Sequence, residues 1–338
     1  MNFPRTARYD IVMTRANGLF AKEKITGFPI EPFEIIKNNK WGLVTYSELA
    51  EEYGVTVDEI KAAFQSEDGY TIYDGTNHTI AYNDTVSVHG RIRFTLMHEI
   101  GHIYMNHLID FDETILRRSN LTETKYKVLE NEANSFARNT LAPVMVVKDL
   151  KINSVGDLVT HFDISTSAAK TRLKALTLDY KVLLSQYIRF QRHNFKSFIY
   201  TFLHSKKCLQ CSYYFVNAEA KYCPVCSSDK LYKSKEKHDM RYDGYELDEF
   251  GRAYECPRCG NEELNYDGDH CKICSLIIIN KCTNQEMWNG EIQWECGTML
   301  DGNARYCIKC GYESTFYQQN LLDKWEDEKK EKEELLPF

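Results

Sequence analysis

Two histidines and a glutamate form a candidate catalytic site, because the segment His98-Glu99-Ile100-Gly101-His102 matches the pattern H-E-x-x-H. On a helix, residues four apart lie on one face, so both imidazoles can reach one zinc ion. Glu99 could then take a proton from a water activated by the metal and pass it to the leaving amine. A surface helix that carries two histidines by chance is the alternative. Phe94 and Ile103 favour a buried helix instead, where this polar set is costly without a metal.

A catalytic zinc needs a third protein ligand and one open position. The helix expected after the motif offers Glu130 and Glu132. Two residues apart on a helix point about 200° from one another, so only one of the two can face the zinc. Glu130 lies beside the apolar face that carries Leu129 and Ala133, whereas Glu132 points more towards solvent. The helical pattern therefore favours Glu130 over Glu132.

Two stretches carry a resemblance to a known family. Residues 94–102, Phe-Thr-Leu-Met-His-Glu-Ile-Gly-His, resemble the F-T-x-x-H-E-x-G-H signature of the ImmA/IrrE metallopeptidases. Residues 130–137, followed by Leu-Ala-Pro at 141–143, are similar to that family's second motif, E-x-x-A-N-x-F-A. The resemblance covers roughly residues 5–180 and implies that Glu130 is the third zinc ligand. The Glu-x-x-x-Asn pattern also resembles thermolysin-like gluzincins, which implies that Asn134 supports the site through a neutral amide.

The resemblance also implies a fold and an activity. The expected fold is α+β, a small gluzincin-like domain in which a short antiparallel sheet packs on the two zinc-bearing helices. The strand at 79–83 would be the edge nearest the metal, where an extended peptide could add by main-chain hydrogen bonds. The implied activity is limited, site-specific cleavage of a protein, typically a helix-turn-helix repressor of a phage or mobile element. Two alternatives remain: a protease acting on an antitoxin or phage protein in defence, and a catalytically dispensable adaptor that binds protein or nucleic acid.

Three other histidines in this half of the chain are weaker candidates. His107 follows His102 by five residues, so on a continuous helix it leaves the metal face. His78 lies in an expected hairpin and His161 in a later helical region. Each could stabilise an oxyanion, but packing or surface roles are favoured for all three.

The elements that must position these residues follow from periodicity and capping signals. Helices are expected at 9–22, 32–37, 45–53, 56–65, 91–108 and 125–140, with two short ones within 154–176. Thr45 and Thr56 are plausible helix caps, and residues 70–82 predict a strand, an Asp-Gly turn and a strand. The pattern at 158–173 resembles the helix-turn-helix-like unit that often follows the family's peptidase core. A helical buttress is favoured over DNA contact, because a few basic residues do not make a phosphate-binding face.

All twelve cysteines lie between residues 208 and 310, and ten of them form C-x-x-C pairs. In a chain without an export signal this spacing indicates metal binding rather than disulfides. Two regular units predict zinc ribbons, with ligands Cys208, Cys211, Cys223 and Cys226 in the first and Cys256, Cys259, Cys271 and Cys274 in the second. The third unit is irregular: Cys296, Cys307 and Cys310 lack a near partner, so Cys282 is expected as the fourth ligand, with His270 as a weaker alternative. The predicted cofactor is therefore zinc, one catalytic and about three structural ions.

Charge distinguishes the three ribbons. Residues 206–241 carry a net charge of +4, residues 242–274 a net charge of −6 and residues 275–312 a net charge of −1. Only the first ribbon could therefore contact nucleic acid, with Tyr213 and its aromatic neighbours stacking on bases. Packing in so small a core explains these aromatics as well. Protein recognition is favoured for the array as a whole.

The whole chain has 338 residues and a formal net charge of −7. It lacks a stretch of roughly 18 apolar residues and the apolar core of a secretory signal, so we expect a cytoplasmic protein without membrane contact. The expected organisation is a helical region (1–65), a metallopeptidase core (66–150), a helical extension (151–205), three ribbons (206–241, 242–278 and 279–314) and a charged tail (315–338). Residues 323–334 of the tail predict a solvated helix or a frayed end.

Overall fold

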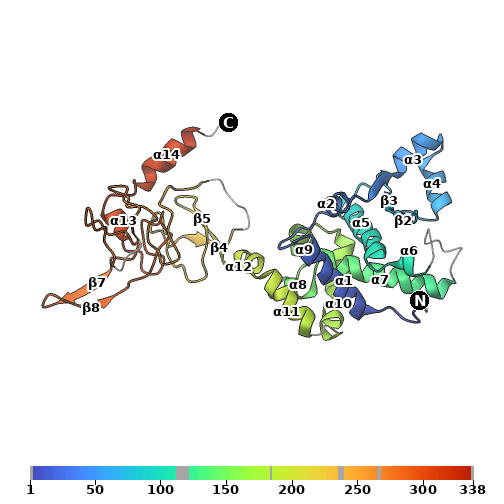
Figure 1. The fold of residues 1–338 in the computed structure, drawn as a ribbon, viewed down its shortest axis with the longest axis horizontal. Coiled ribbons are helices and arrows are strands. Elements are labelled where there is room, and N and C mark those ends of the chain that lie inside the picture. Colours follow the sequence, from blue (N-terminus) through green and yellow to red (C-terminus); the bar gives the residue numbers. More distant parts are fainter. Residues whose placement is uncertain (1–2, 112–121, 183–184, 235–239, 265–267, 336–338) are drawn as a thin grey trace. The chain divides into compact units, whose positions relative to one another are not determined.

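The chain forms two compact units, Met1–Ile199 and Tyr200–Phe338. The computed structural model describes residues 3–111, 122–182, 185–234, 240–264 and 268–335 (Figure 1). The finer domain boundaries expected from the sequence stay predictions. Among the described residues, no helix has the length and apolar character needed to cross a membrane.

The first unit is mostly helical. Its helices are α1 (Tyr9–Lys22), α2 (Pro32–Asn38), α3 (Tyr46–Tyr53), α4 (Val57–Phe64), α5 (His89–Tyr104), α6 (His107–Asp110), α7 (Glu123–Leu141), α8 (Val144–Asp149), α9 (Val155–Phe162), α10 (Thr166–Val182), α11 (Ser185–Asn194) and α12 (Lys196–His204), the last of which ends in the second unit. The predicted caps are confirmed: Thr45 and Thr56 each form a capping box with the glutamate three residues later. The α+β fold class is also confirmed, because a small sheet accompanies these helices.

That sheet has three strands, β1 (Gly42–Thr45), β2 (Gly69–Tyr73) and β3 (His78–Tyr82), in the order β1-β3-β2. β2 and β3 are antiparallel, as the Asp-Gly turn predicts, but β1 pairs with β3 in parallel. The sequence-based expectation missed β1, because four residues are too few to show a period. The expectation that the strand at 79–83 is the sheet edge is wrong: β1 covers β3, and β2 is the edge strand beside the site helix.

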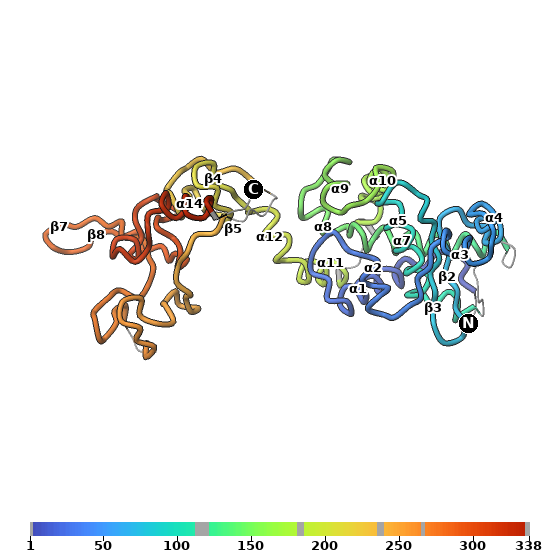
Figure 2. Tube along the Cα trace, turned by 90° about the horizontal axis from the view of Figure 1, so that it is seen from above, coloured from blue at the N-terminus to red at the C-terminus, as the bar shows by residue number. Residues whose placement is uncertain are grey.

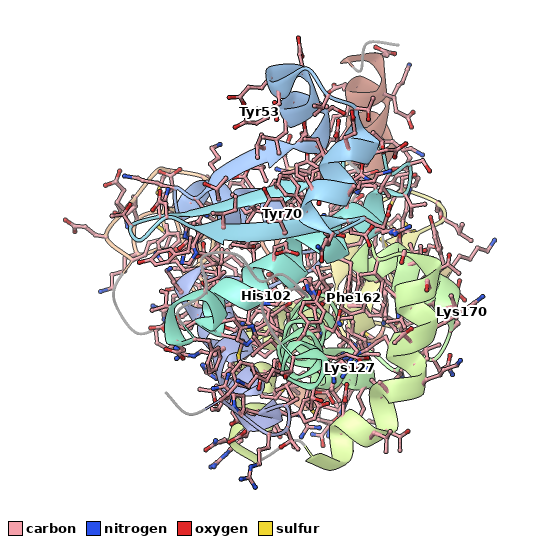
Figure 3. All side chains as sticks on the ribbon, turned by 90° about the vertical axis from the view of Figure 1, so that its right-hand side faces the viewer. Tyr53, Tyr70, His102, Lys127, Phe162 and Lys170 are labelled. Atoms are coloured by element: carbon pink, nitrogen blue, oxygen red, sulfur yellow. The ribbon has the colours of Figure 1, made fainter. Side chains whose placement is uncertain are left out.

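α5 lies between the sheet and α7. Figure 3 shows His102 of α5 between the strand that carries Tyr70 and the helix that carries Lys127. Gly101 makes the close approach of α5 and α7 feasible, because a Cβ there would lie 3.3 Å from the Ala133 backbone and 3.2 Å from the Phe136 ring. The glycine of the motif thereby brings the two helices that carry the candidate ligands into contact.

The expected single helix at 91–108 is divided into two. α5 ends at Tyr104, and Asn106 adopts the left-handed conformation with φ of 55° before α6 begins at His107. Asparagine is one of the few residues that tolerate this conformation. The break changes the direction of the chain, so the position of His107 cannot be extrapolated from α5.

The helical extension packs on the peptidase core. Leu158 and Phe162 of α9 are fully buried, and the buried Arg172 of α10 pairs with Asp179 at 2.7 Å. A basic side chain of the helix-turn-helix-like pattern is therefore engaged within the protein. This arrangement agrees with the favoured role of a buttress.

The second unit contains short strands and turns (Figure 2). β4 (Ser205–Cys208), β5 (Tyr214–Val216) and β6 (Leu231–Tyr232) form one antiparallel sheet, and β7 (Gln285–Trp288) pairs with β8 (Glu291–Glu295) in a hairpin. α13 (Thr315–Gln318) and α14 (Trp325–Leu335) follow.

The first and third cysteine units contact each other directly. The amides of Arg305 and Tyr306 donate to the carbonyl of Pro224 at 2.8 and 2.9 Å. The expected solvated tail is wrong for one face of α14, because buried Glu328 accepts a hydrogen bond from the buried guanidinium of Arg305 at 2.5 Å. Charge composition cannot reveal such a pair, since it depends on which side chain the fold places opposite.

Candidate metal centre and active site

Three side chains from two helices converge at one point. The Nε2 atoms of His98 and His102 on α5 are 3.0 Å apart, and each lies 3.4 Å from a carboxylate oxygen of Glu130 on α7. Zinc–nitrogen and zinc–oxygen bonds of about 2.0–2.1 Å in a tetrahedron place ligand atoms roughly 3.3–3.4 Å apart. The spacing of these three atoms therefore suits a zinc ion.

The charges of the three side chains also suit a cation. Burial opposes ionisation of Glu130, but hydrogen bonds from His102 and His98 outweigh it and lower the pKa of its carboxyl. Burial likewise opposes protonation of His98, but Glu130 outweighs it and raises the pKa of His98 to about 9. These opposite shifts show that the three side chains favour positive charge at the candidate metal position.

Glu99 lies beside these groups in the same cavity, which has a volume of about 210 Å³. Burial raises the pKa of its carboxyl to about 7, against the opposing effects of His98 and Thr71. The hydroxyl of Thr71 on β2 donates a hydrogen bond to Glu99 Oε2 at 2.8 Å. Thr71 was not among the site residues predicted from the sequence. The sequence offered one indication of its role, namely a hydroxyl side chain in a strand that was expected to pack on the zinc-bearing helix.

Thr71→Val should lower proteolytic turnover while leaving metal binding unchanged. Valine keeps the side-chain volume but removes the donor that orients Glu99, a loss of about tenfold for one hydrogen bond to a charged group. Thr79→Val on β3 is the matched control. Steady-state cleavage rates with measured metal content check this, and equal rates for Thr71→Val and wild type would refute the role of Thr71.

Asn134 and Glu132 have different neighbours. Asn134 Oδ1 lies 3.1 Å from His98 Nδ1, on the side of the ring away from the candidate metal position. The expectation that Glu132 points towards solvent is wrong, because its side chain is 0% exposed. α7 packs against α1 as well as α5, so both of its sides are covered. A helical period identifies an apolar face but cannot reveal a second neighbour.

His107 is buried and lies outside both the candidate ligand group and the cavity, as expected, but it contacts the ligand His102 from behind. Its Nδ1 lies 2.9 Å from His102 Nδ1, and its Nε2 lies 2.9 Å from Glu132 Oε2. Burial lowers the pKa of His107 to about 4, so the ring is neutral at pH 7. His78 instead packs beside Tyr73 and Trp41, and neither His78 nor His161 lines the cavity.

The structure brings the twelve cysteines together in three groups of four, as free thiols. These are Cys208, Cys211, Cys223 and Cys226; Cys256, Cys259, Cys271 and Cys274; and Cys282, Cys296, Cys307 and Cys310. One sulfur pair in each group is 3.5, 3.5 and 3.4 Å apart, and all ligand atoms of a group lie within 4.8 Å, near the roughly 3.8 Å expected for tetrahedral zinc with bonds of about 2.3 Å. Cys282 thus lies with the three cysteines of the irregular unit, and His270 is in none of the groups. Together with His98, His102 and Glu130, the described residues contain four groups that could bind a metal ion.

A known protein family matches the part of the chain that carries the candidate site. Residues 50–174 match the family model Peptidase_M78, the IrrE N-terminal-like domain. No match to a curated protein was found. The matched range includes the H-E-x-x-H segment, β2, Glu130 and Asn134. Residues 50–174, which carry the candidate site, are therefore similar to the IrrE N-terminal-like domain of the Peptidase_M78 family.

Proposed function

We propose that this protein is a zinc-dependent endopeptidase that makes limited cuts in a protein substrate. One observation carries the proposal: Glu99 shares a buried cavity with His98, His102 and Glu130, whose ligand atoms are spaced for one ion. The family match of the surrounding domain supports peptide hydrolysis. The three cysteine groups are proposed as structural zinc sites, and a reducing compartment such as the cytoplasm would keep their thiols free.

A zinc ion held by His98, His102 and Glu130 would supply Lewis-acid polarisation of the scissile carbonyl and would lower the pKa of water. Glu99 takes the proton from the attacking water and delivers it to the leaving amine, oriented by Thr71. Tyr126, one turn before Glu130 on α7, also lines the cavity. Gly69 and Thr71 of edge strand β2 also line the cavity, so an extended substrate can pair with β2.

A second cavity of about 540 Å³ shares Phe94 and Asn134 with the first. Leu141 and Ile164 contribute to its apolar wall, and Arg138 contributes charge. We propose that it accepts substrate side chains next to the scissile bond, because it adjoins the catalytic cavity.

The ribbon array is proposed to recognise protein rather than nucleic acid. In the first cysteine group, Tyr213 packs against Phe215 and Tyr242, and its hydroxyl accepts a hydrogen bond from Asn303. Tyr213 therefore has a packing role. The β7–β8 hairpin exposes Trp288 and Trp294, which are 68% and 49% accessible. Residues 285–295 contain three glutamates and no lysine or arginine, which opposes contact with phosphates.

Replacing both exposed tryptophans of the hairpin by alanine should weaken substrate affinity without slowing the chemistry. Tethering raises the effective concentration of the substrate at the active site but leaves the reaction unchanged. We therefore expect a rise in KM of at least about tenfold at constant kcat, since buried aromatic anchors contribute most to an interface. Replacing exposed Tyr53 of α3 by alanine is the control. A fall in kcat with constant KM would contradict the targeting role.

The proposed substrate is a helix-turn-helix repressor of a phage or mobile element, as the ImmA/IrrE resemblance implies. The rival substrates are an antitoxin or another phage protein. The test is incubation of the full-length protein with purified candidates of each class, followed by intact-mass measurement of new termini. Cleavage of a repressor at one or two bonds supports the proposal. Cleavage of the antitoxin alone would favour the defence alternative, and no cleavage of any folded protein would contradict the endopeptidase.

A further inference from the structure

On the side of each ring that faces away from the metal position, the two candidate ligand histidines hydrogen-bond to different side chains. His98 Nδ1 meets the neutral amide of Asn134 at 3.1 Å. His102 Nδ1 meets His107 Nδ1 at 2.9 Å, and His107 Nε2 meets Glu132 Oε2 at 2.9 Å. Of these two paths, only the one from His102 ends on a carboxylate.

The orientation of the rings determines where the protons lie. Nε2 of His102 faces the metal position, so the proton of a neutral ligand imidazole is on Nδ1 and is donated to His107 Nδ1. His107 then carries its own proton on Nε2 and donates it to Glu132. Each ring nitrogen of this path therefore has a defined role, and the path runs in one direction from ligand to carboxylate.

Glu132 is held as a carboxylate although it is fully buried. Oε1 accepts hydrogen bonds from the backbone amide and Nε of Arg8 at 2.7 and 2.9 Å, and Oε2 accepts one from Arg8 Nη2 at 2.8 Å. With His107 these make four donors to one carboxylate. A buried charge is tolerated when it is paired and hydrogen-bonded in this way.

We propose that His107 and Glu132 are positioning residues that orient His102 and increase its basicity towards the metal. The inference rests on the proposed function, since it assumes a metal ion on His98, His102 and Glu130. A carboxylate that accepts from a ligand histidine fixes its tautomer and strengthens the metal bond. Here a second imidazole stands between the ligand and the carboxylate. The anionic support that Asn134 does not give to His98 is thus supplied to His102 by Glu132.

The test measures metal affinity in the full-length protein with zinc left in the cysteine sites. Added Co²⁺ is titrated and its visible absorption recorded, with Glu130→Gln as the baseline that lacks a ligand. Glu132→Gln keeps the side-chain shape but removes the charge, and His107→Phe keeps a ring but removes both nitrogens. Each should weaken Co²⁺ binding by about 10–100-fold, the usual cost of losing a partner behind a ligand.

A double variant separates a connected path from general loosening. Because the hydrogen-bonded path from Glu132 to His102 passes through His107, the double variant should lose much less Co²⁺ affinity than the product of the two single losses. Losses that multiply would overturn the path. Asn139→Ala is the matched control, because Asn139 is buried on α7 but contacts Ser135 and Arg172 instead. It should lower the thermal unfolding temperature without changing Co²⁺ affinity.

Two further outcomes are distinct. If the wild type binds Co²⁺ and Glu132→Gln binds it with the same affinity, the positioning role is overturned and the proposed function still stands. A wild-type protein that binds no more Co²⁺ than Glu130→Gln would overturn the proposed function together with this inference.

Discussion

Glu99→Gln should abolish proteolysis while the protein stays folded and keeps all of its metal. Glutamine has nearly the same shape but cannot take a proton, and general acid–base catalysis contributes about 10²–10⁴-fold. We expect kcat to fall by about 10³-fold or more with little change in substrate affinity. The measurement is single-turnover cleavage of an identified substrate, with metal content determined on the same sample.

Glu123→Gln is a suitable control, because Glu123 is exposed at the start of α7 and pairs with Lys127 away from the cavity. It should cleave like the wild type. The biological effect of Glu99→Gln distinguishes enzyme from adaptor: an adaptor would keep its effect in the cell without this carboxylate. Full activity of Glu99→Gln in either assay would remove Glu99 from the catalytic role.

Local sequence signals predicted much of the fold around the site. The bounds of α1 agree with the expected 9–22, and the capping boxes of α3 and α4 were visible as Thr followed three residues later by Glu. These signals succeed because a cap or an apolar period depends only on residues within one helix. For the same reason, the spacing of His98 and His102 placed both rings on one face of α5.

The hydrogen-bonded path from His102 through His107 to Glu132 could not be predicted in the same way. It depends on the left-handed conformation of Asn106, which moves His107 off the expected helical course. It also depends on Arg8, which is 124 residues from Glu132 in the sequence. A pairing over that separation arises from the packing of α1 on α7, and a helical period contains no information about it.

In the second unit, contacts between separate modules could likewise not be predicted from the sequence. Cysteine spacing was enough to group the regular ribbons, but the contact between Pro224 and Arg305 joins two ribbons that look independent in the sequence. The buried pair of Arg305 and Glu328 likewise fastens α14, whose composition suggested a solvated helix. Contacts between modules depend on surfaces that only the folded units create.

The central claim is that His98, His102 and Glu130 hold a zinc ion separate from the cysteine sites. Glu130→Gln replaces a charged ligand by a neutral amide, which should release that ion because zinc prefers carboxylate, imidazole and thiolate ligands. Glu123→Gln on the same helix is the control and should keep the wild-type metal content. The cysteine groups share no residue with this site, so they should remain loaded.

Elemental analysis of the full-length protein, freed of loosely bound metal by gel filtration, tests this claim without a known substrate. The wild type should contain four zinc ions per chain, matching the four groups, and Glu130→Gln should contain three. Four zinc ions in Glu130→Gln, or three or fewer in the wild type, would contradict a catalytic zinc held by His98, His102 and Glu130.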